Sequence, residues 1–85
     1  MLDVVQFKSF PSFFAKEKSG VKNNTVRVAT EMDDERFTTL RYWYHSQRYG
    51  KIRITNSDTG DYFERQIRDI TFWMDMWIIS WEHSD

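Results

Sequence analysis

Three polar residues whose side chains could carry out chemistry follow one another closely in the first third of the chain. Lys22, Thr25 and Arg27 come directly behind Gly20, in the stretch SGVKNNTVR. If a strand begins near Asn24, Thr25 and Arg27 project from the same face, because side chains alternate along a strand. An ammonium, a hydroxyl and a guanidinium could then converge to bind a phosphate or a carbonyl. Alternatively, a desolvated lysine could activate the hydroxyl as a nucleophile.

The same residues also have a purely structural explanation. Gly20 can end a helix in the left-handed conformation. Thr25 has a high strand propensity, and Arg27 can be an exposed strand residue. Their spacing alone leaves both interpretations open.

The elements that must position these residues are predicted from apolar spacing, capping residues and turns. In the first helix, Phe10, Phe13 and Phe14 are spaced to place three rings on one face. A bulge near residues 68–69 would bring the apolar residues of one long strand to one side, and residues 74–75 form a tight turn. The sequence predicts strands over about 2–7, 25–29, 51–55, 61–71 and 77–81, and helices over 11–19 and 33–46.

The predicted fold class is α+β. Five short, mainly antiparallel strands with two helices around one core most simply form a sheet that closes towards a small β-barrel, because closure hides the strand edges. The 85 residues are expected to form a single domain, 1–85. The chain contains no Cys, which excludes disulfides and thiolate zinc sites.

Charge is distributed unevenly along a chain whose net charge is −1. Residues 36–56 contain five basic and no acidic side chains, whereas residues 57–85 contain two basic and seven acidic ones. Basic and aromatic residues alternate in the first of these segments, a composition suited to holding phosphates and stacking single-stranded bases. A solvated helix face or a protein contact would have the same composition. The candidate nucleic-acid contacts are Arg41, Tyr42, Arg48, Tyr49, Lys51 and Arg53.

Neither a metal site nor a membrane segment is expected. His45 and His83 have no ligand partners at helical spacing, and the loop around Asp58, Gly60 and Asp61 lacks the spacing of a calcium loop. We therefore expect no metal and no cofactor. The N-terminus lacks the basic region and apolar run of a signal peptide, and no stretch approaches the roughly 20 apolar residues that span a bilayer. A cytoplasmic protein is the expectation.

The segment FFAKEKSGVKNNTVR resembles the opening of ASCH domains, small β-barrels of the PUA-like superfamily. In that family an amphipathic helix ends in a G-x-K-x-x-T-x-R run that enters the barrel. Gly20, Lys22, Thr25 and Arg27 match this run. The stretch KIRITNSDTGDYFERQIRDITFW and the closing WIISW are similar to the family's barrel strands. The resemblance implies a PUA-like barrel with a pocket lined by Lys22, Thr25 and Arg27.

The resemblance also implies what the pocket does. Family members are proposed to bind RNA or to recognise modified nucleotides, so Lys22, Thr25 and Arg27 would bind RNA, a nucleotide or a modified nucleoside. One enzymatic branch hydrolyses N4-acetylcytidine with a Lys, a Thr and a distant Glu. As an amidohydrolase, this chain would use Lys22 and Thr25, with Glu64 as a substitute at a different location. The family's helical insertion before the last strand is missing here, which favours binding over catalysis.

A third hypothesis belongs to another class. Short proteins of this appearance are frequent in phages and prophages, where they would act in the cytoplasm of the host cell. Such a protein could bind a host protein through its acidic C-terminal third, residues 58–85.

Overall fold

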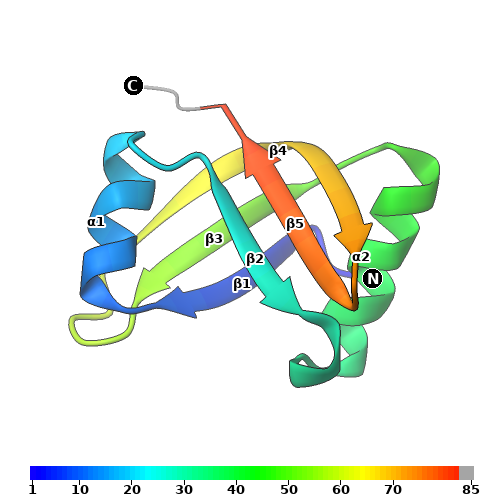
Figure 1. Cartoon of the computed structure of the whole chain (residues 1–85), viewed down its shortest axis with the longest axis horizontal. Coiled ribbons are helices and arrows are strands. Elements are labelled where there is room, and N and C mark those ends of the chain that lie inside the picture. Colours follow the sequence, from blue (N-terminus) through cyan, green and yellow to red (C-terminus); the bar gives the residue numbers. More distant parts are fainter. Residues whose placement is uncertain (83–85) are drawn as a thin grey trace.

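The computed structural model describes residues 1–82. The elements are β1 (Val4–Ser9), α1 (Pro11–Ser19), β2 (Asn24–Val28), η1 (Ala29–Glu31), α2 (Asp34–Ser46), β3 (Lys51–Asn56), β4 (Tyr62–Trp73) and β5 (Met76–Trp81) (Figure 1). Each strand and each α-helix expected from the sequence is present, with its ends displaced by no more than two residues. The prediction of the elements is therefore confirmed.

The five strands form one curled, half-barrel sheet in the order β1-β3-β4-β5-β2 (Figure 1). Neighbouring strands are antiparallel except for β1 and β3, which are parallel, with Val5 opposite Ile52 and Phe7 opposite Ile54. A parallel pair needs a crossover connection, which α1, β2 and α2 provide. The α+β class with mainly antiparallel strands is confirmed, and the sheet keeps two open edges, β1 and β2.

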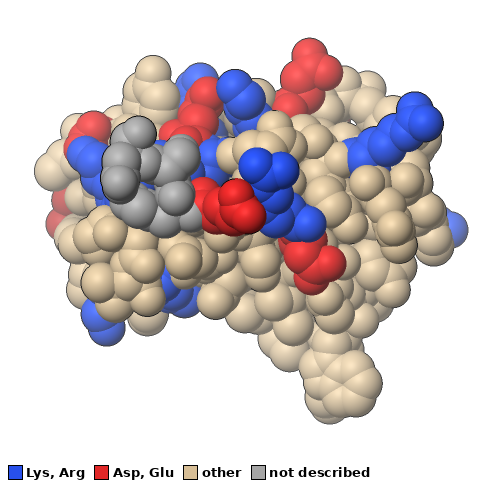
Figure 2. Space-filling view, turned by 90° about the horizontal axis from the view of Figure 1, so that it is seen from above, with Lys and Arg blue, Asp and Glu red and all other residues tan. Residues whose placement is uncertain are grey.

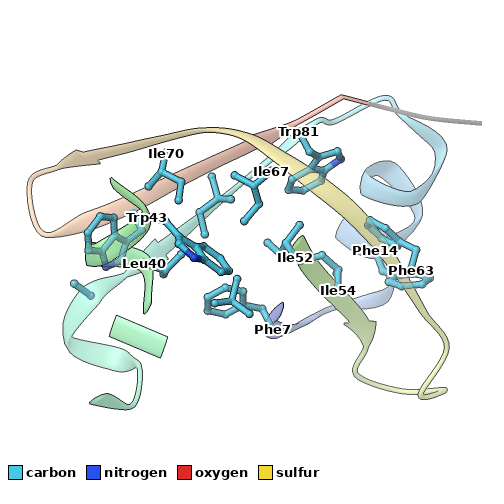
Figure 3. Close-up of a cluster of buried hydrophobic side chains, with 14 residues drawn as sticks. Phe7, Phe14, Leu40, Trp43, Ile52, Ile54, Phe63, Ile67, Ile70 and Trp81 are labelled. Atoms are coloured by element: carbon cyan, nitrogen blue, oxygen red, sulfur yellow. The ribbon is translucent and has the colours of Figure 1, made fainter. Parts of the chain in front are cut away.

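The hydrophobic core fills the concave side of the sheet (Figure 3). α1 and α2 lie at opposite ends of the curl (Figure 1). At the α1 end, the ring centroid of Phe14 is 5.5 Å from that of Phe63. Leu40 and Trp43 bury the inner face of α2 at the other end. Between them lie almost completely buried strand residues: Val5, Ile52, Ile54, Ile67 and Ile79.

The three-ring face predicted for α1 is wrong. Only Phe14 is buried, whereas Phe10 precedes the helix and is 70% exposed, and Phe13 is 46% exposed. One turn beyond Phe14, the inward position is occupied by Glu17, which is 1% exposed. α1 therefore closes its end of the half-barrel with one ring and one carboxylate.

The irregularity predicted in the long strand is confirmed. The register of β4 against β5 shifts between Ile67 and Asp69, so that Ile67 and Ile70 both reach the core. The hairpin turns at Met74 and Asp75, whose φ angles of 47° and 64° are positive. A two-residue turn of this kind matches the twist of the strands that it joins.

Two arginines bridge the open edges of the sheet. Arg27 on β2 donates from Nη1 to the Lys8 carbonyl of β1 at 3.0 Å. Arg36 on α2 donates from Nη1 to the Gln6 carbonyl at 3.0 Å. Both guanidinium groups lie over the ring of Phe7, 4.8 and 5.0 Å from its centroid. Side chains, in place of strand pairing, therefore connect β1 to β2 and α2.

The N-terminus of α2 carries a cap that makes stability depend on pH. Asp33 accepts hydrogen bonds from the backbone N–H and from Nε of Arg36, at 2.9 and 3.1 Å, and these bonds lower the pKa of Asp33. Because the folded-state pKa is the lower one, Asp33 stabilises the fold above about pH 4, the unfolded value. This contribution is lost as the pH falls through the folded-state pKa.

Asp33→Ala should therefore lower the melting temperature by a few degrees at neutral pH, since it removes the cap. At about pH 2 the difference from the wild type should be smaller, because uptake of a proton by Asp33 removes the charge that strengthens the cap. Thermal unfolding followed by circular dichroism at both pH values measures the effect. Asp34→Ala, one residue into α2, is the matched control. An equal loss for Asp33→Ala at both pH values would contradict the role of its charge.

Candidate functional site

A cavity of about 390 Å³ opens between α1, β1 and β2. Phe10 and Phe13 form part of its apolar wall. Its charged and hydroxyl side chains are Lys8, Ser9, Glu17, Lys22, Thr25, Arg27 and Ser57. The structure thus brings the three residues singled out by their spacing to the lining of one cavity.

The end of α1 positions Lys22. Gly20 adopts the left-handed conformation, with φ of 89°, and ends the helix. The chain then folds back, so that the backbone N–H of Lys22 donates to the Lys16 carbonyl at 3.0 Å. Lys22 Nζ lies 4.0 Å from Oε2 of Glu17 and 5.2 Å from the ring centroid of Phe13. The ammonium therefore sits between a carboxylate and an aromatic face.

Strand β2 positions Thr25 and Arg27. They pair with Ile79 and Trp77 of β5, which are buried, so both point to the concave side of the sheet. Arg27 donates from Nε to Thr25 Oγ1 and from Nη2 to Ser9 Oγ, each at 3.0 Å. With its bond to β1, the guanidinium uses three of its five N–H donors. It is held firmly while keeping two donors for other partners.

Arg27 is a desolvated positive charge. Burial lowers the pKa of Arg27, the negative charge of Glu17 opposes this change, and the positive charge of Arg36 adds to it. A guanidinium remains protonated in proteins even so. The cavity therefore contains a fixed cation that is only partly hydrated, and such a cation attracts anionic or strongly polar ligand groups.

Glu17 is the site residue that the sequence analysis missed. It is 1% exposed, and its Oε1 has no hydrogen-bond partner among residues 1–82. Burying a carboxylate without hydrogen bonds costs a free energy on the order of several kcal/mol. The signal in the sequence is a position: residue 17 follows Phe13 and Phe14 by four and three residues, where the inward helix face requires an apolar side chain.

Glu64 is not part of the cavity. It lies on β4 next to the buried Phe63, so its side chain points to the convex side of the sheet. There it accepts hydrogen bonds from Nε and Nη2 of Arg53, its cross-strand partner, at 2.8 and 2.6 Å. The carboxylate that joins the candidate site is Glu17 on α1 and not Glu64.

The basic and aromatic segment also lies apart from the cavity. Tyr42 is exposed on α2, whereas Tyr49 is only partly exposed because it packs against the core. The Arg53 guanidinium is engaged by Glu64 and lies 4.4 Å from the ring centroid of Tyr62. The lining of the cavity includes none of the six candidates from this segment: Arg41, Tyr42, Arg48, Tyr49, Lys51 and Arg53.

Folding mixes charges that the sequence separates. On the face seen from above, Lys and Arg side chains lie beside Asp and Glu side chains (Figure 2). Three basic side chains each lie within ion-pair distance of a carboxylate of the acidic C-terminal third. These pairs are Lys18–Asp61 at 3.2 Å, Arg53–Glu64 at 2.6 Å and Arg68–Glu82 at 3.6 Å.

A second cavity, of about 680 Å³, shares Lys8 and Arg27 with the first and extends along the start of α2. Two of its charged groups bind one another, Asp33 and Arg36, and Arg36 also binds the Gln6 carbonyl. The smaller cavity contains Glu17, whose buried Oε1 has no hydrogen-bond partner among residues 1–82. It is therefore the better candidate site despite its size.

Two further observations concern metal ions and membranes. Within residues 1–82, no three His, Asp or Glu side chains lie close enough to hold a metal ion together. His83 lies outside the described residues. In the same part of the chain, neither α-helix has the length and apolar composition needed to cross a membrane.

The sequence matches no protein-family model and no curated protein.

Proposed function

We propose that the chain is a small PUA-like domain of the ASCH kind, and that it binds RNA, a nucleotide or a modified nucleoside in the 390 Å³ cavity. The resemblance of the G-x-K-x-x-T-x-R run supports the proposal, as does the curled five-stranded sheet. The single observation that carries it is the buried carboxylate of Glu17. One of its oxygens lacks a hydrogen-bond partner among residues 1–82, and Lys22, Arg27 and two phenylalanines line the same cavity.

The lining suits the parts of a nucleotide. Phe10 and Phe13 offer exposed aromatic faces, on which a base can stack. Lys22, the Thr25 hydroxyl and the free donors of Arg27 can bind carbonyl or phosphate oxygens. Glu17 can accept hydrogen bonds from ring or amino N–H groups. A cavity of a few hundred Å³ with few polar groups and apolar walls is typical of sites for small ligands.

The geometry favours binding over hydrolysis. Thr25 Oγ1 accepts a hydrogen bond from Arg27 Nε, and no hydrogen bond joins Thr25 to Lys22 among the described residues. Lys22 Nζ instead lies 4.0 Å from Glu17 Oε2, whereas a general base must lie within hydrogen-bond reach of the hydroxyl that it deprotonates. An amidohydrolase acting on N4-acetylcytidine-like nucleosides therefore has less support than a binding domain.

Lys22→Ala should weaken nucleotide binding about 10-fold, because it removes a charge-assisted contact at the cavity. Isothermal titration calorimetry with the four ribonucleoside 5′-monophosphates measures the affinity for free nucleotides. Fluorescence anisotropy with a short single-stranded RNA measures the affinity for RNA. This affinity should fall as the salt concentration rises, since phosphate contacts release counterions. Lys18→Ala is the matched control, because Lys18 pairs with Asp61.

Failure of every nucleotide and of the RNA to bind at millimolar concentration would overturn the proposal. So would equal affinities for Lys22→Ala and Lys18→Ala, because binding would then occur away from the cavity. A melting curve for each variant separates lost contacts from lost folding.

A further inference from the structure

Lys22 and Glu17 place one hydrogen-bond donor group and two acceptor oxygens next to one another in the lining of the cavity. Lys22 Nζ lies 4.0 Å from Glu17 Oε2, which is too long for a hydrogen bond. Both groups therefore retain hydrogen-bonding capacity. Oε1, the other oxygen of the same carboxylate, is buried and has no partner among residues 1–82. Taken in sequence, Nζ, Oε2 and Oε1 present one donor followed by two acceptors.

We infer that this edge selects guanine, so that the preferred ligand of the cavity is a guanine nucleotide, free or in single-stranded RNA. The inference rests on the proposed function and adds the identity of the base. Guanine presents an acceptor, O6, followed by two donors, the N1–H and the N2 amino group. Lys22 would donate to O6, while Oε2 and Oε1 of Glu17 would accept from N1–H and N2–H.

The other common bases match this order less well. Uracil presents acceptor, donor, acceptor, so its second carbonyl would face Oε1 and repel it. Cytosine presents a donor where Lys22 needs an acceptor, followed by acceptors that face the carboxylate. Adenine likewise directs its amino group towards the ammonium and its ring nitrogen towards the carboxylate. A buried site that leaves its polar groups unpaired rejects the wrong ligand strongly.

The remaining lining is consistent with this orientation. Phe13 is 46% exposed although it lies on α1, and its ring is close to Lys22, so a base that reaches Glu17 can stack on it. Lys8 and the unused donors of Arg27 line the same cavity. They can receive the ribose and phosphate of a base whose edge points to α1.

Inosine 5′-monophosphate tests the contact between Glu17 Oε1 and the N2 amino group, because it differs from guanosine 5′-monophosphate only by lacking that amino group. Isothermal titration should show the guanine nucleotide binding at least about 10-fold more tightly than the inosine nucleotide. The nucleotides of uracil, cytosine and adenine should bind more weakly still. Glu17→Gln, which keeps the side-chain shape and replaces one acceptor by a donor, should remove most of this preference.

Glu64→Gln is the matched control, because Glu64 lies on the convex side of the sheet. It should leave the preference unchanged. Equal binding of guanine and inosine nucleotides, or tighter binding of a pyrimidine, would overturn the guanine assignment. If that binding remained sensitive to Lys22→Ala, the proposed function would stand. If no nucleotide bound at all, both would fall.

Discussion

Replacing Glu17 with methionine should raise the free energy of unfolding by about 1–3 kcal/mol, although the substitution removes a charged residue from the candidate site. The carboxylate is 1% exposed, and the positive charges of Lys22, at 4.0 Å, and of Arg27 compensate only in part for its lost hydration. Methionine has a similar length, contains no polar group that needs a partner, and adapts to irregular spaces. After the substitution Lys22, whose side chain is 33% exposed, can turn to water, and the partly buried Arg27 keeps its hydrogen bonds to Thr25, Ser9 and the Lys8 carbonyl.

Chemical denaturation with urea measures this effect as a higher midpoint with an unchanged slope. The same variant should lose nucleotide binding, the trade of function for stability that is common at binding sites. Glu64→Met is the control: it breaks the partly buried ion pair with Arg53 on the convex side of the sheet, and it should not raise the free energy of unfolding. A Glu17→Met protein that is less stable than the wild type would show that Glu17 holds the fold together and is not kept for a ligand.

The second large effect concerns Gly50, between α2 and β3. Gly50→Ala should destabilise the protein by about 3 kcal/mol or prevent folding, because this position has no room for a methyl group. An added Cβ would overlap the backbone carbonyl of Asp3 and the indole ring of Trp43. Neither obstacle can move easily: the Asp3 carbonyl accepts a hydrogen bond from Lys51 where β1 meets β3, and Trp43 is buried in the core.

Gly60→Ala provides the contrast. Gly60 has a positive φ of 78° but no atom within 4 Å of an added Cβ, so only backbone strain opposes the substitution. A cost of about 1 kcal/mol is expected. Urea denaturation of both variants compares the two effects. If Gly50→Ala lowered the free energy of unfolding no more than Gly60→Ala, the close contact between β1, α2 and β3 at Gly50 would be contradicted.

The elements of the fold could be predicted because their signals are local. Pro11 and Gly20 delimit α1, and the alternation of Ile52 and Ile54 with polar residues marks β3. The bulge near Asp69 follows from side-chain parity within a single strand. Each of these signals depends on residues within a few positions of one another, which is the range over which backbone geometry repeats.

The strand arrangement could be predicted only in part. Antiparallel hairpins between consecutive strands follow from short connections such as residues 57–61 and 74–75. The parallel pairing of β1 with β3 joins segments separated by two helices and a strand. No local pattern specifies such a partner, because the pairing depends on how the intervening elements pack.

The candidate site shows the same division. The spacing of Lys22, Thr25 and Arg27 allowed their convergence, because a helix end and a strand period could position all three, but the spacing alone left a purely structural role open. Helical periodicity also places position 17 on the inward face of α1. A charged residue at this position, however, suggests that this side of the helix faces solvent. Phe13 is exposed and Glu17 is buried because α1 packs its Phe14 side against Phe63 across the end of the half-barrel.

The choice between the two carboxylates was likewise decided by packing. Glu17 and Glu64 both lie close in sequence to apolar residues expected in the core. Glu64, however, points to the convex side of β4, where Arg53 lies directly opposite. Elements, turns and helix ends are encoded by neighbours in the chain and were therefore predictable from sequence. Which carboxylate enters the cavity depends on contacts between α1, β2 and β4, and burial at such a junction arises only when the elements come together.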